Sequence, residues 1–359
     1  MAQRKNHHFV PQFYFRRFSL DERSICVLTR ETGQTIRCAS IKAQASRDRF
    51  YGSDEVEKFL GKVEGESSLA LRVLSGLQDP TDLPDEHLGV LLPWLALQRT
   101  RTETARQTSK PMNDMILRLF LEAEIGNDEY LTQEQKAERF NQLEEVSSDA
   151  VQSQIMEMDL AIGASGRLSD LEPLLLENRT NRPFIFSDSP VVLHNACYES
   201  VKWRGVLGFE SPGLLLSYPL SPKLSLLLVD QACYRIKGAP KGRVHIRDLN
   251  DIRALNKLQI HSSSSCTYFH DFEFASYVKN LWEQEREVMK AHGASVNEAP
   301  GFDSVSGESL GDIVHSFQPL LPIKLRLSFL QSLVGGDEEY RFVPRSSRAW
   351  PDLTERRQP

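Results

Sequence analysis

The periodicity of the apolar residues changes near residue 180, and this change limits the folds that the chain can adopt. Between residues 53 and 178, apolar side chains recur every three or four positions, as in SDEVEKFLGKVEGESSLALRVLSG, which is typical of amphipathic helices. From residue 183, short runs such as RPFIFSDSPVVL and GLLLSYPLSPKLSLLLVD are punctuated by Pro and Gly, which predicts β-strands. Near the N-terminus, SICVLTRETGQTIRCASI predicts a β-hairpin around the turn-forming ETGQ.

This order of elements predicts an α+β fold with segregated helices and strands. We expect an N-terminal segment and β-hairpin, a central helical bundle, and then a mixed or antiparallel β-sheet with a C-terminal helix. A single domain over residues 1–292 is expected, with a helical part at about 53–178 and a β-rich part at about 183–275; a split into two lobes near residue 180 is the alternative. Residues 293–312 resemble a linker in composition, and 313–359 are expected to form a strand-like segment and a loose tail.

Composition limits the environment and the partners of the chain. Its 359 residues are 40% hydrophobic and 26% charged, as in soluble globular proteins. The net charge of -6 argues against broad electrostatic binding to nucleic acid, although a local basic patch is compatible with it. Five scattered cysteines without a C-x-x-C spacing favour a reducing compartment. No leader sequence and no apolar run near the roughly 18 residues of a membrane helix are found, so we expect a cytoplasmic protein.

A polar interruption marks the end of the helix predicted after Pro84. Its leucine stripe runs from Leu88 to Leu95, and the same spacing then reaches Gln98 and Arg99, with Arg101 on the flank. One interpretation is that the helix leaves the core and its stripe meets solvent. The other is a polar pocket in which Arg99 or Arg101 binds an anion, since a buried arginine requires a partner.

Two carboxylates each lie next to a predicted apolar segment. Glu64 borders the apolar stripe of the first long helix, where a glutamate is usually solvated. Asp188 follows the predicted strand FIFS, and its carboxylate could act as a base or ligate a metal at the strand end. An Asp before Ser-Pro is also a common turn-forming residue, so both interpretations stay open.

The N-terminal stretch KNHHFVPQFYFRRF contains adjacent histidines. In an extended segment His7 and His8 must point to opposite sides, so only one of them can face a site. Pro11 suits the first turn of a short helix, which places Gln12 and Arg16 one turn apart on one face. The aromatic residues Tyr14, Phe15 and Phe18 would anchor the segment. The alternative is a docked terminus with both histidines in solvent.

Several motifs together resemble a known family. NHHFVPQFYFRRF, KVEGESS, LALQRTRT, FIFSDSPV, YPLSPKLSLLL and LNKLQ occur in the order found in the bacterial domain-of-unknown-function family 4238, over residues 5 to 275. The family's strand motif often reads T-S-D-N-P, whereas this chain has Phe186 and Ser189 at the variable positions. The resemblance implies an order of motifs and a convergence of the polar residues at one site: His7, His8, Gln12, Glu64, Gln98, Arg101 and Asp188.

Such a set of residues would suit the cleavage of a phosphate ester, and we expect a phosphoesterase with nuclease as its subtype. Asp188 and Glu64 would hold Mg²⁺ or Mn²⁺, and His8 or His7 would act as general acid or base. The substrate, a nucleic acid or nucleotide, would be bound by Gln12, Gln98, Arg99 and Arg101. Two alternatives remain: a nucleotide- or peptide-binding module without chemistry, and a buried structural network.

Overall fold

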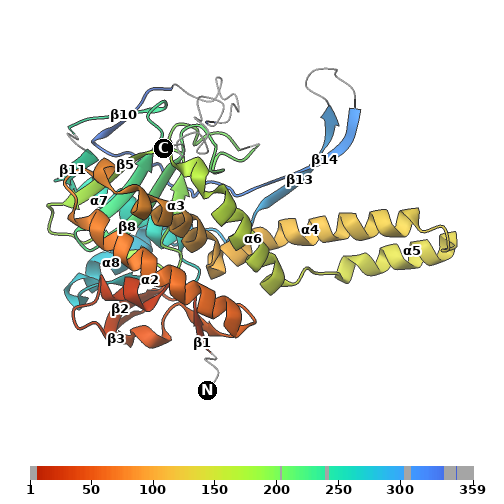
Figure 1. Cartoon of the computed structure of the whole chain (residues 1–359), viewed down its shortest axis with the longest axis horizontal. Helices are drawn as coiled ribbons and strands as arrows, with labels where there is room; N and C mark the ends of the chain where they lie inside the picture. Colours follow the sequence, from red (N-terminus) through yellow and green to blue (C-terminus); the bar gives the residue numbers. More distant parts are fainter. Residues whose placement is uncertain (1–5, 203, 239–241, 303–308, 335–344, 346–359) are drawn as a thin grey trace.

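The computed structural model describes residues 6–202, 204–238, 242–302, 309–334 and 345, and shows a globular body from which one long and one shorter helix project (Figure 1). The α+β fold is confirmed, with a C-terminal helix after the main sheets. The helices are α1 (Gln12–Arg16), α2 (Asp54–Gly76), α3 (Asp85–Thr100), α4 (Glu103–Asn127), α5 (Gln133–Gln142), α6 (Ala150–Ala164), α7 (Leu249–Ser262) and α8 (Ala275–Glu285).

A five-stranded sheet forms the centre of the body, in the order β11-β5-β9-β8-β7. Its strands are β5 (Glu172–Asn178), β7 (Val192–His194), β8 (Leu215–Ser221), β9 (Leu224–Val229) and β11 (Arg243–Ile246), and only the β11–β5 pair is parallel. Every residue of β9 is buried. Leu226 and Leu228 pack into one core cluster, whereas Leu227 and Val229 pack into another. The strand is therefore apolar throughout because the sheet is covered on both faces.

A second, four-stranded sheet contains the predicted hairpin. β2 (Ser24–Thr29) and β3 (Thr35–Ser40) pair with each other and continue through β12 (Cys266–Phe269) to β6 (Phe186–Ser187). The hairpin turn contains Gly33 at φ +65°, and an added Cβ there would come within 2.3 Å of the Trp282 ring. The turn therefore needs glycine for both its backbone angle and its contact with α8.

The N-terminal segment is docked as the aromatic pattern predicts. β1 (Asn6–His8) pairs with β4 (Ser46–Asp48), and α1 follows directly. Tyr14 stacks on Tyr218 with ring centroids 5.0 Å apart and donates a hydrogen bond to the carbonyl of Pro219. Phe15 and Phe18 pack against Phe186. These contacts fix the segment that contains α1 against both sheets.

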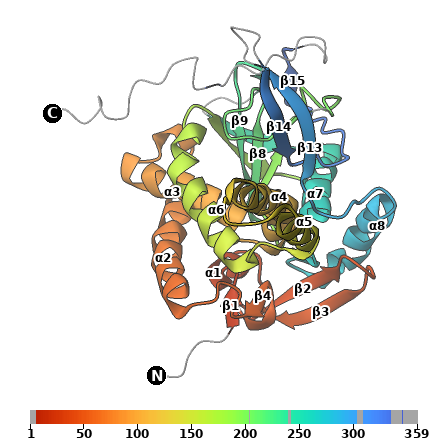
Figure 2. The same cartoon turned by 90° about the vertical axis from the view of Figure 1, so that its right-hand side faces the viewer.

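Helices α4 and α5 form an arm that projects from the body, and Figure 2 shows this arm nearly end-on in front of α6. Beside the arm, β13 (Ser295–Phe302) and β14 (Ser309–Phe317) form an antiparallel pair. The prediction of a linker at 293–312 is therefore wrong for the described part of that range. The Pro and Gly residues suggested coil, but a two-stranded ribbon tolerates Pro300 because each strand has a free edge.

Two other boundaries differ from the sequence prediction. The helical part ends before residue 178, since β5 already belongs to the central sheet. In the C-terminal part, β15 (Leu330–Ser332) pairs with β10 (Tyr234–Ile236), whereas most of the predicted tail, residues 346–359, lies outside the described residues. The assignment of 1–292 to a single domain stays a prediction. No helix in the described part of the chain is long and apolar enough to cross a membrane.

Candidate functional site

The two N-terminal histidines point in opposite directions, as the extended conformation of β1 requires. His7 is fully buried, and its Nδ1 accepts a hydrogen bond of 3.2 Å from the backbone N–H of Tyr51. Its Nε2 lies 4.0 Å from a carboxylate oxygen of Asp54. His8 is half-buried and its Nε2 lies 3.1 Å from the carbonyl of Lys42. His8 is therefore the histidine that can meet a ligand, whereas His7 supports the start of α2.

Arg101 is fully buried at the end of α3 and binds three different segments. Its Nη2 forms an ion pair of 2.9 Å with Glu64 on α2 and donates a 2.6 Å hydrogen bond to the carbonyl of His8. Its Nε donates to the hydroxyl of Tyr51 at 3.2 Å. Burial lowers the pKa of Arg101, but Tyr51 and Glu64 outweigh this effect and raise the pKa above its usual value. The guanidinium therefore stays charged and fixes Glu64 in place.

Gln98 has a related role one turn earlier on α3. Its side chain is buried, and Nε2 donates a 2.9 Å hydrogen bond to the carbonyl of Phe9. Gln98 and Arg101 thus bind the carbonyls of two consecutive N-terminal residues. The polar end of the leucine stripe is explained by these contacts: α3 does not leave the core there, but docks the segment that carries His8.

A pocket of about 460 Å³ lies between the N-terminal segment and α2. It is lined by His8, Gln12, Phe13 and Arg16 on one side and by Glu57, Gly61, Glu64, Gly65 and Ser68 on the other. The residues of α2 share one face because they recur at helical spacing. Arg16 is exposed and lies 3.5 Å from the amide oxygen of Gln12. The pocket therefore combines a histidine, carboxylates, a guanidinium and an amide within one open cavity.

Two glycines leave the α2 side of this pocket without side chains at two positions. Gly61 and Gly65 are one turn apart, and apart from the adjoining residues and backbone of α2 no described atom lies within 4 Å of the place where a Cβ would stand at either position. Packing therefore does not require glycine, although each one in a helix interior costs about 1 kcal/mol relative to alanine. The space above them is available to a ligand.

Asp188 is not among the residues that line this pocket. Its carboxylate accepts hydrogen bonds of 2.7 to 3.0 Å from the backbone N–H groups of Ser264, Ser265 and Cys266 and from the hydroxyl of Ser264. Burial raises the pKa of Asp188, and these donors oppose the shift. The neighbouring Ser189 lies 3.3 Å from Thr102, next to Arg101, but the carboxylate itself closes the turn before β12. These contacts support the structural interpretation of Asp188.

Arg99 also lies apart from the pocket. It is partly buried, it donates a hydrogen bond to the side chain of Gln318, and it lines a different, small cavity together with His292. Burial lowers its pKa to about 10. Residues two positions apart do not share a helix face, which separates Arg99 from Arg101.

The pair of carboxylates expected to hold Mg²⁺ or Mn²⁺ is not brought together by any contact. Glu64 is bound by Arg101 and Asp188 by the turn at 264–266. Within the described residues, no group of three or more His, Cys, Asp or Glu side chains is arranged to hold a metal ion. The sequence interpretation also missed Glu57, although its position seven residues before Glu64 places both on one face of α2.

The fold and the site together define an α+β protein with an open polar pocket between its docked N-terminal segment and α2. The family model described as "Protein of unknown function (DUF4238)" matches residues 6–273, and the chain belongs to that family. Neither the curated proteins nor the solved structures gave a match to the chain. The matched range includes every residue that lines the pocket.

Proposed function

We propose that the pocket between the N-terminal segment and α2 binds a phosphate diester and cleaves it by general acid–base catalysis, as a nuclease-like phosphoesterase. One observation supports this proposal above the others. His8 and Glu64 come from separate elements and line one open cavity, whose N-terminal wall also carries Arg16 and Gln12. A proton acceptor, a proton donor and an anion-binding group are the parts that such a reaction needs.

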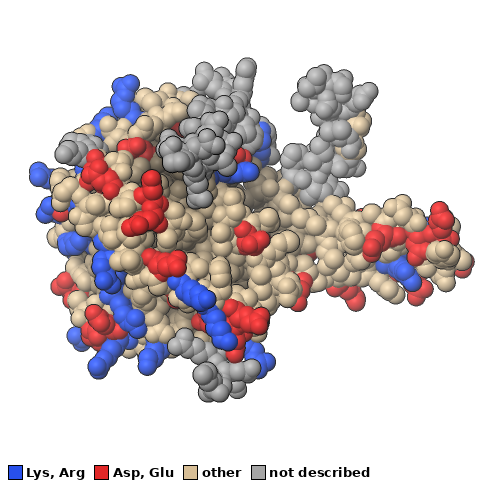
Figure 3. Space-filling model, viewed as in Figure 1, with Lys and Arg blue, Asp and Glu red and all other residues tan. Residues whose placement is uncertain are grey.

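The charges around the pocket are compatible with an anionic substrate. The ion pair with Arg101 offsets the negative charge of Glu64, so this carboxylate repels a phosphate less than a free one would. Arg16 is exposed at the N-terminal wall and can reach a phosphoryl oxygen. By contrast, most of the charged side chains visible on the projecting arm in Figure 3 are acidic. A polyanion would therefore bind the body and avoid the arm.

In the proposed step, Glu64 accepts one proton from the substrate side and His8 donates one proton to it. Arg16 and Gln12 hold the non-bridging oxygens of the phosphate. Glu64 takes the proton of the attacking hydroxyl or water as its oxygen forms a bond to phosphorus. His8 gives a proton to the leaving oxygen as its bond to phosphorus breaks. Arg101 is a positioning residue, since it holds Glu64 and the His8 carbonyl without lining the pocket. Gln98 and His7 act further away, through the Phe9 carbonyl and through Tyr51 and Asp54.

The expected site of action is the cytoplasm, and two observations support this part of the proposal. All five cysteines are free thiols in the structure, as a reducing compartment would keep them. The described part of the chain also contains no helix fit to span a bilayer.

The test uses fluorophore-labelled single-stranded RNA and DNA and a nitrophenyl phosphodiester as substrates. His8→Ala and Glu64→Gln should each lower the rate by about 100-fold or more, the range of one lost acid or base. Glu66→Gln on the exposed side of α2 and His245→Ala on β11 serve as matched controls and should keep the rate of the original chain.

Each outcome of this test decides a specific alternative. Binding without cleavage, in buffer with EDTA and with added Mg²⁺ or Mn²⁺, would replace the enzyme by a binding module. Cleavage that persists in His8→Ala would show that this pocket is not the active site. Cleavage that depends on added Mg²⁺ or Mn²⁺ would replace the metal-free step by a metal-assisted one at the same pocket.

A further inference from the structure

A second chemical feature lies in the β-rich part of the body, where two cysteines from separate turns meet. Cys197 follows β7, and Cys233 lies in the turn between β9 and β10. Both residues are buried, and they belong to turns that lie against each other in the folded chain. The Cys197 thiol also lies 3.5 Å from the carbonyl of Cys233. This contact places the Cys197 sulfur beside the backbone of Cys233, so the two side chains are close enough for a disulfide to form after a small movement.

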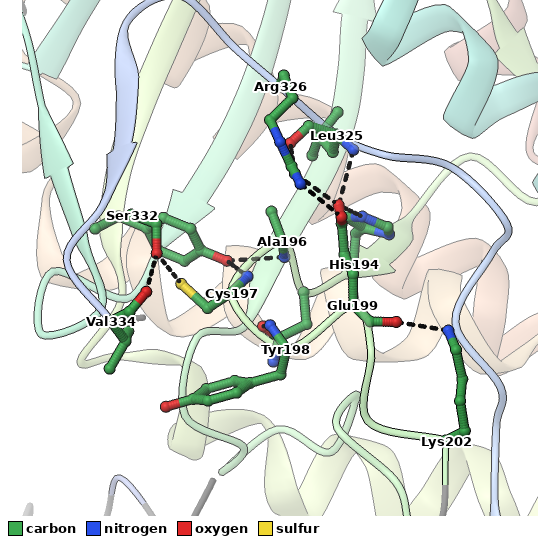
Figure 4. Close-up of polar contacts among 12 residues, drawn as sticks. His194, Ala196, Cys197, Tyr198, Glu199, Lys202, Leu325, Arg326, Ser332 and Val334 are labelled. Carbon is green, nitrogen blue, oxygen red and sulfur yellow. Dashed lines mark hydrogen bonds and ion pairs between the residues drawn. The ribbon is translucent and has the colours of Figure 1, made fainter. Parts of the chain in front are cut away.

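The backbone around these cysteines is held firmly. The hydroxyl of Tyr234 accepts hydrogen bonds from the N–H groups of Ala196 and Cys197, at 2.9 and 3.1 Å, and donates to the carbonyl of Gly213. Figure 4 shows the Cys197 sulfur directed toward Ser332 of β15, with a separation of 3.2 Å from its hydroxyl oxygen. The position of the sulfur is therefore defined by three segments of the chain.

A small molecule can reach this sulfur. Cys197 lines a pocket of about 380 Å³ whose wall also contains Glu199, Arg326 and Ser332. Arg326 forms an ion pair with Glu199 at 2.9 Å, and Figure 4 shows this pair beside His194. Cys233 is absent from the residues that line the pocket. A reagent that enters the pocket therefore meets Cys197 first.

The two thiols also differ in reactivity. The hydrogen bond from Cys233 lowers the pKa of Cys197 to about 7 against the effect of burial, whereas the pKa of Cys233 is raised by the same contact and by burial. Burial raises the pKa of Cys26 to about 11 and that of Cys266 to about 12. Because the thiolate is the nucleophile, Cys197 is the reactive member of the pair and Cys26 and Cys266 are protected.

We propose that Cys197 and Cys233 form a reversible oxidation site for a hydroperoxide, with Cys197 as the attacking thiol and Cys233 as the resolving thiol. The Cys197 thiolate attacks the terminal peroxide oxygen, the O–O bond breaks, and Cys197 becomes a sulfenic acid. With one proton the leaving group departs as water from hydrogen peroxide, or as an alcohol from an organic hydroperoxide. The Cys233 thiol then displaces the sulfenic hydroxyl as water and forms the disulfide. The cysteines supply two electrons and the peroxide accepts them. This site is independent of the pocket at α2.

The experiment treats the folded chain with equimolar hydrogen peroxide at pH 7, blocks the remaining thiols, and maps the peptides by mass spectrometry without reduction. Cys38→Ser serves as the background because Cys38 is exposed. The expected product has lost two hydrogen atoms, contains one Cys197–Cys233 linked peptide, and reverts on addition of dithiothreitol. In Cys233→Ser, the reaction should stop at a Cys197 sulfenic acid that dimedone traps.

Matched variants make the result decisive. Cys266→Ser replaces another partly buried cysteine and should leave the linked peptide unchanged, whereas Cys197→Ser should leave Cys233 reduced. Thermal melting shows that each variant is folded before treatment. The proposal is overturned if the folded chain gives no linked peptide, or if Cys26 or Cys266 is oxidised as fast as Cys197.

Discussion

Replacing Glu64 with Gln tests how the pocket is built, because this change removes the counter-ion of a fully buried arginine. The guanidinium of Arg101 would keep the His8 carbonyl and the Tyr51 hydroxyl as acceptors. Among the described residues its Nη1 already has no hydrogen-bond partner. The loss of one partner of a buried ion pair costs about 3–5 kcal/mol.

The expected value is smaller because Glu64 itself retains 25% of its side-chain exposure. Solvent screens such a group, so Glu64→Gln should lower the free energy of unfolding by about 2 kcal/mol. Urea denaturation followed by circular dichroism measures this value as a shift in midpoint at constant slope. Glu66→Gln, an exposed neighbour on α2, should stay within about 0.5 kcal/mol of the original chain.

A double-mutant cycle with Arg101→Met then isolates the pair. The interaction energy between the two changes should fall between about 1 and 3 kcal/mol, as for groups in direct contact. If Glu64→Gln costs less than about 0.5 kcal/mol, or if the two changes simply add, the claim that Arg101 fixes Glu64 in place is refuted.

Four further substitutions test other parts of the structure. Gly61→Ala and Gly65→Ala should each raise the free energy of unfolding by up to about 1 kcal/mol while they lower the cleavage rate, because the new methyl groups occupy the pocket; equal rates would show that the space above α2 is not used. Asp188→Asn should cost about 2–4 kcal/mol, since an amide cannot accept all four hydrogen bonds, yet the cleavage rate of the folded protein should not change. The pKa of His292 is lowered to about 4, chiefly by burial, so between about pH 6.5 and 4 the unfolded chain binds the proton that the folded chain excludes. The free energy of unfolding should therefore decrease as the pH is lowered from about 6.5 to 4, by on the order of 2 kcal/mol more than in His292→Gln. Parallel curves for the two proteins would contradict this assignment.

Local features of the fold were predicted well from the sequence. The β2–β3 hairpin follows from alternating apolar residues around a Gly-containing turn, and α2 follows from helical spacing after Ser53, whose hydroxyl accepts a hydrogen bond from the N–H of Val56. The opposite orientations of His7 and His8 follow from the geometry of any extended strand. In each case the information lies within a few residues of the position concerned.

The features that could not be predicted depend on partners far away in the chain. The hydrogen-bond donors to Asp188 come from residues 76 to 78 positions later. The local sequence is therefore equally compatible with Asp188 as a general base, a metal ligand or a turn residue. The partner of Arg101 is 37 residues earlier on another helix, and only the packing of α2 beside α3 selects Glu64 instead of a neighbouring glutamate. Strand β13 pairs with β14 in a range whose composition resembles coil, because pairing between strands can override weak local propensity.

The most direct measurement of the central claim is chemical rescue of His8→Gly by imidazole in a single-turnover cleavage assay on single-stranded RNA. Removal of the ring leaves a space beside Gln12 and Glu64 at the wall of the pocket, and imidazole can enter it and transfer the proton. The account predicts a rate about 100-fold or more below that of the original chain, partly restored by imidazole and not by an N-free analogue such as cyclopentanol. An unchanged rate in His8→Gly, or a lost rate that imidazole does not restore, would contradict a catalytic role for His8.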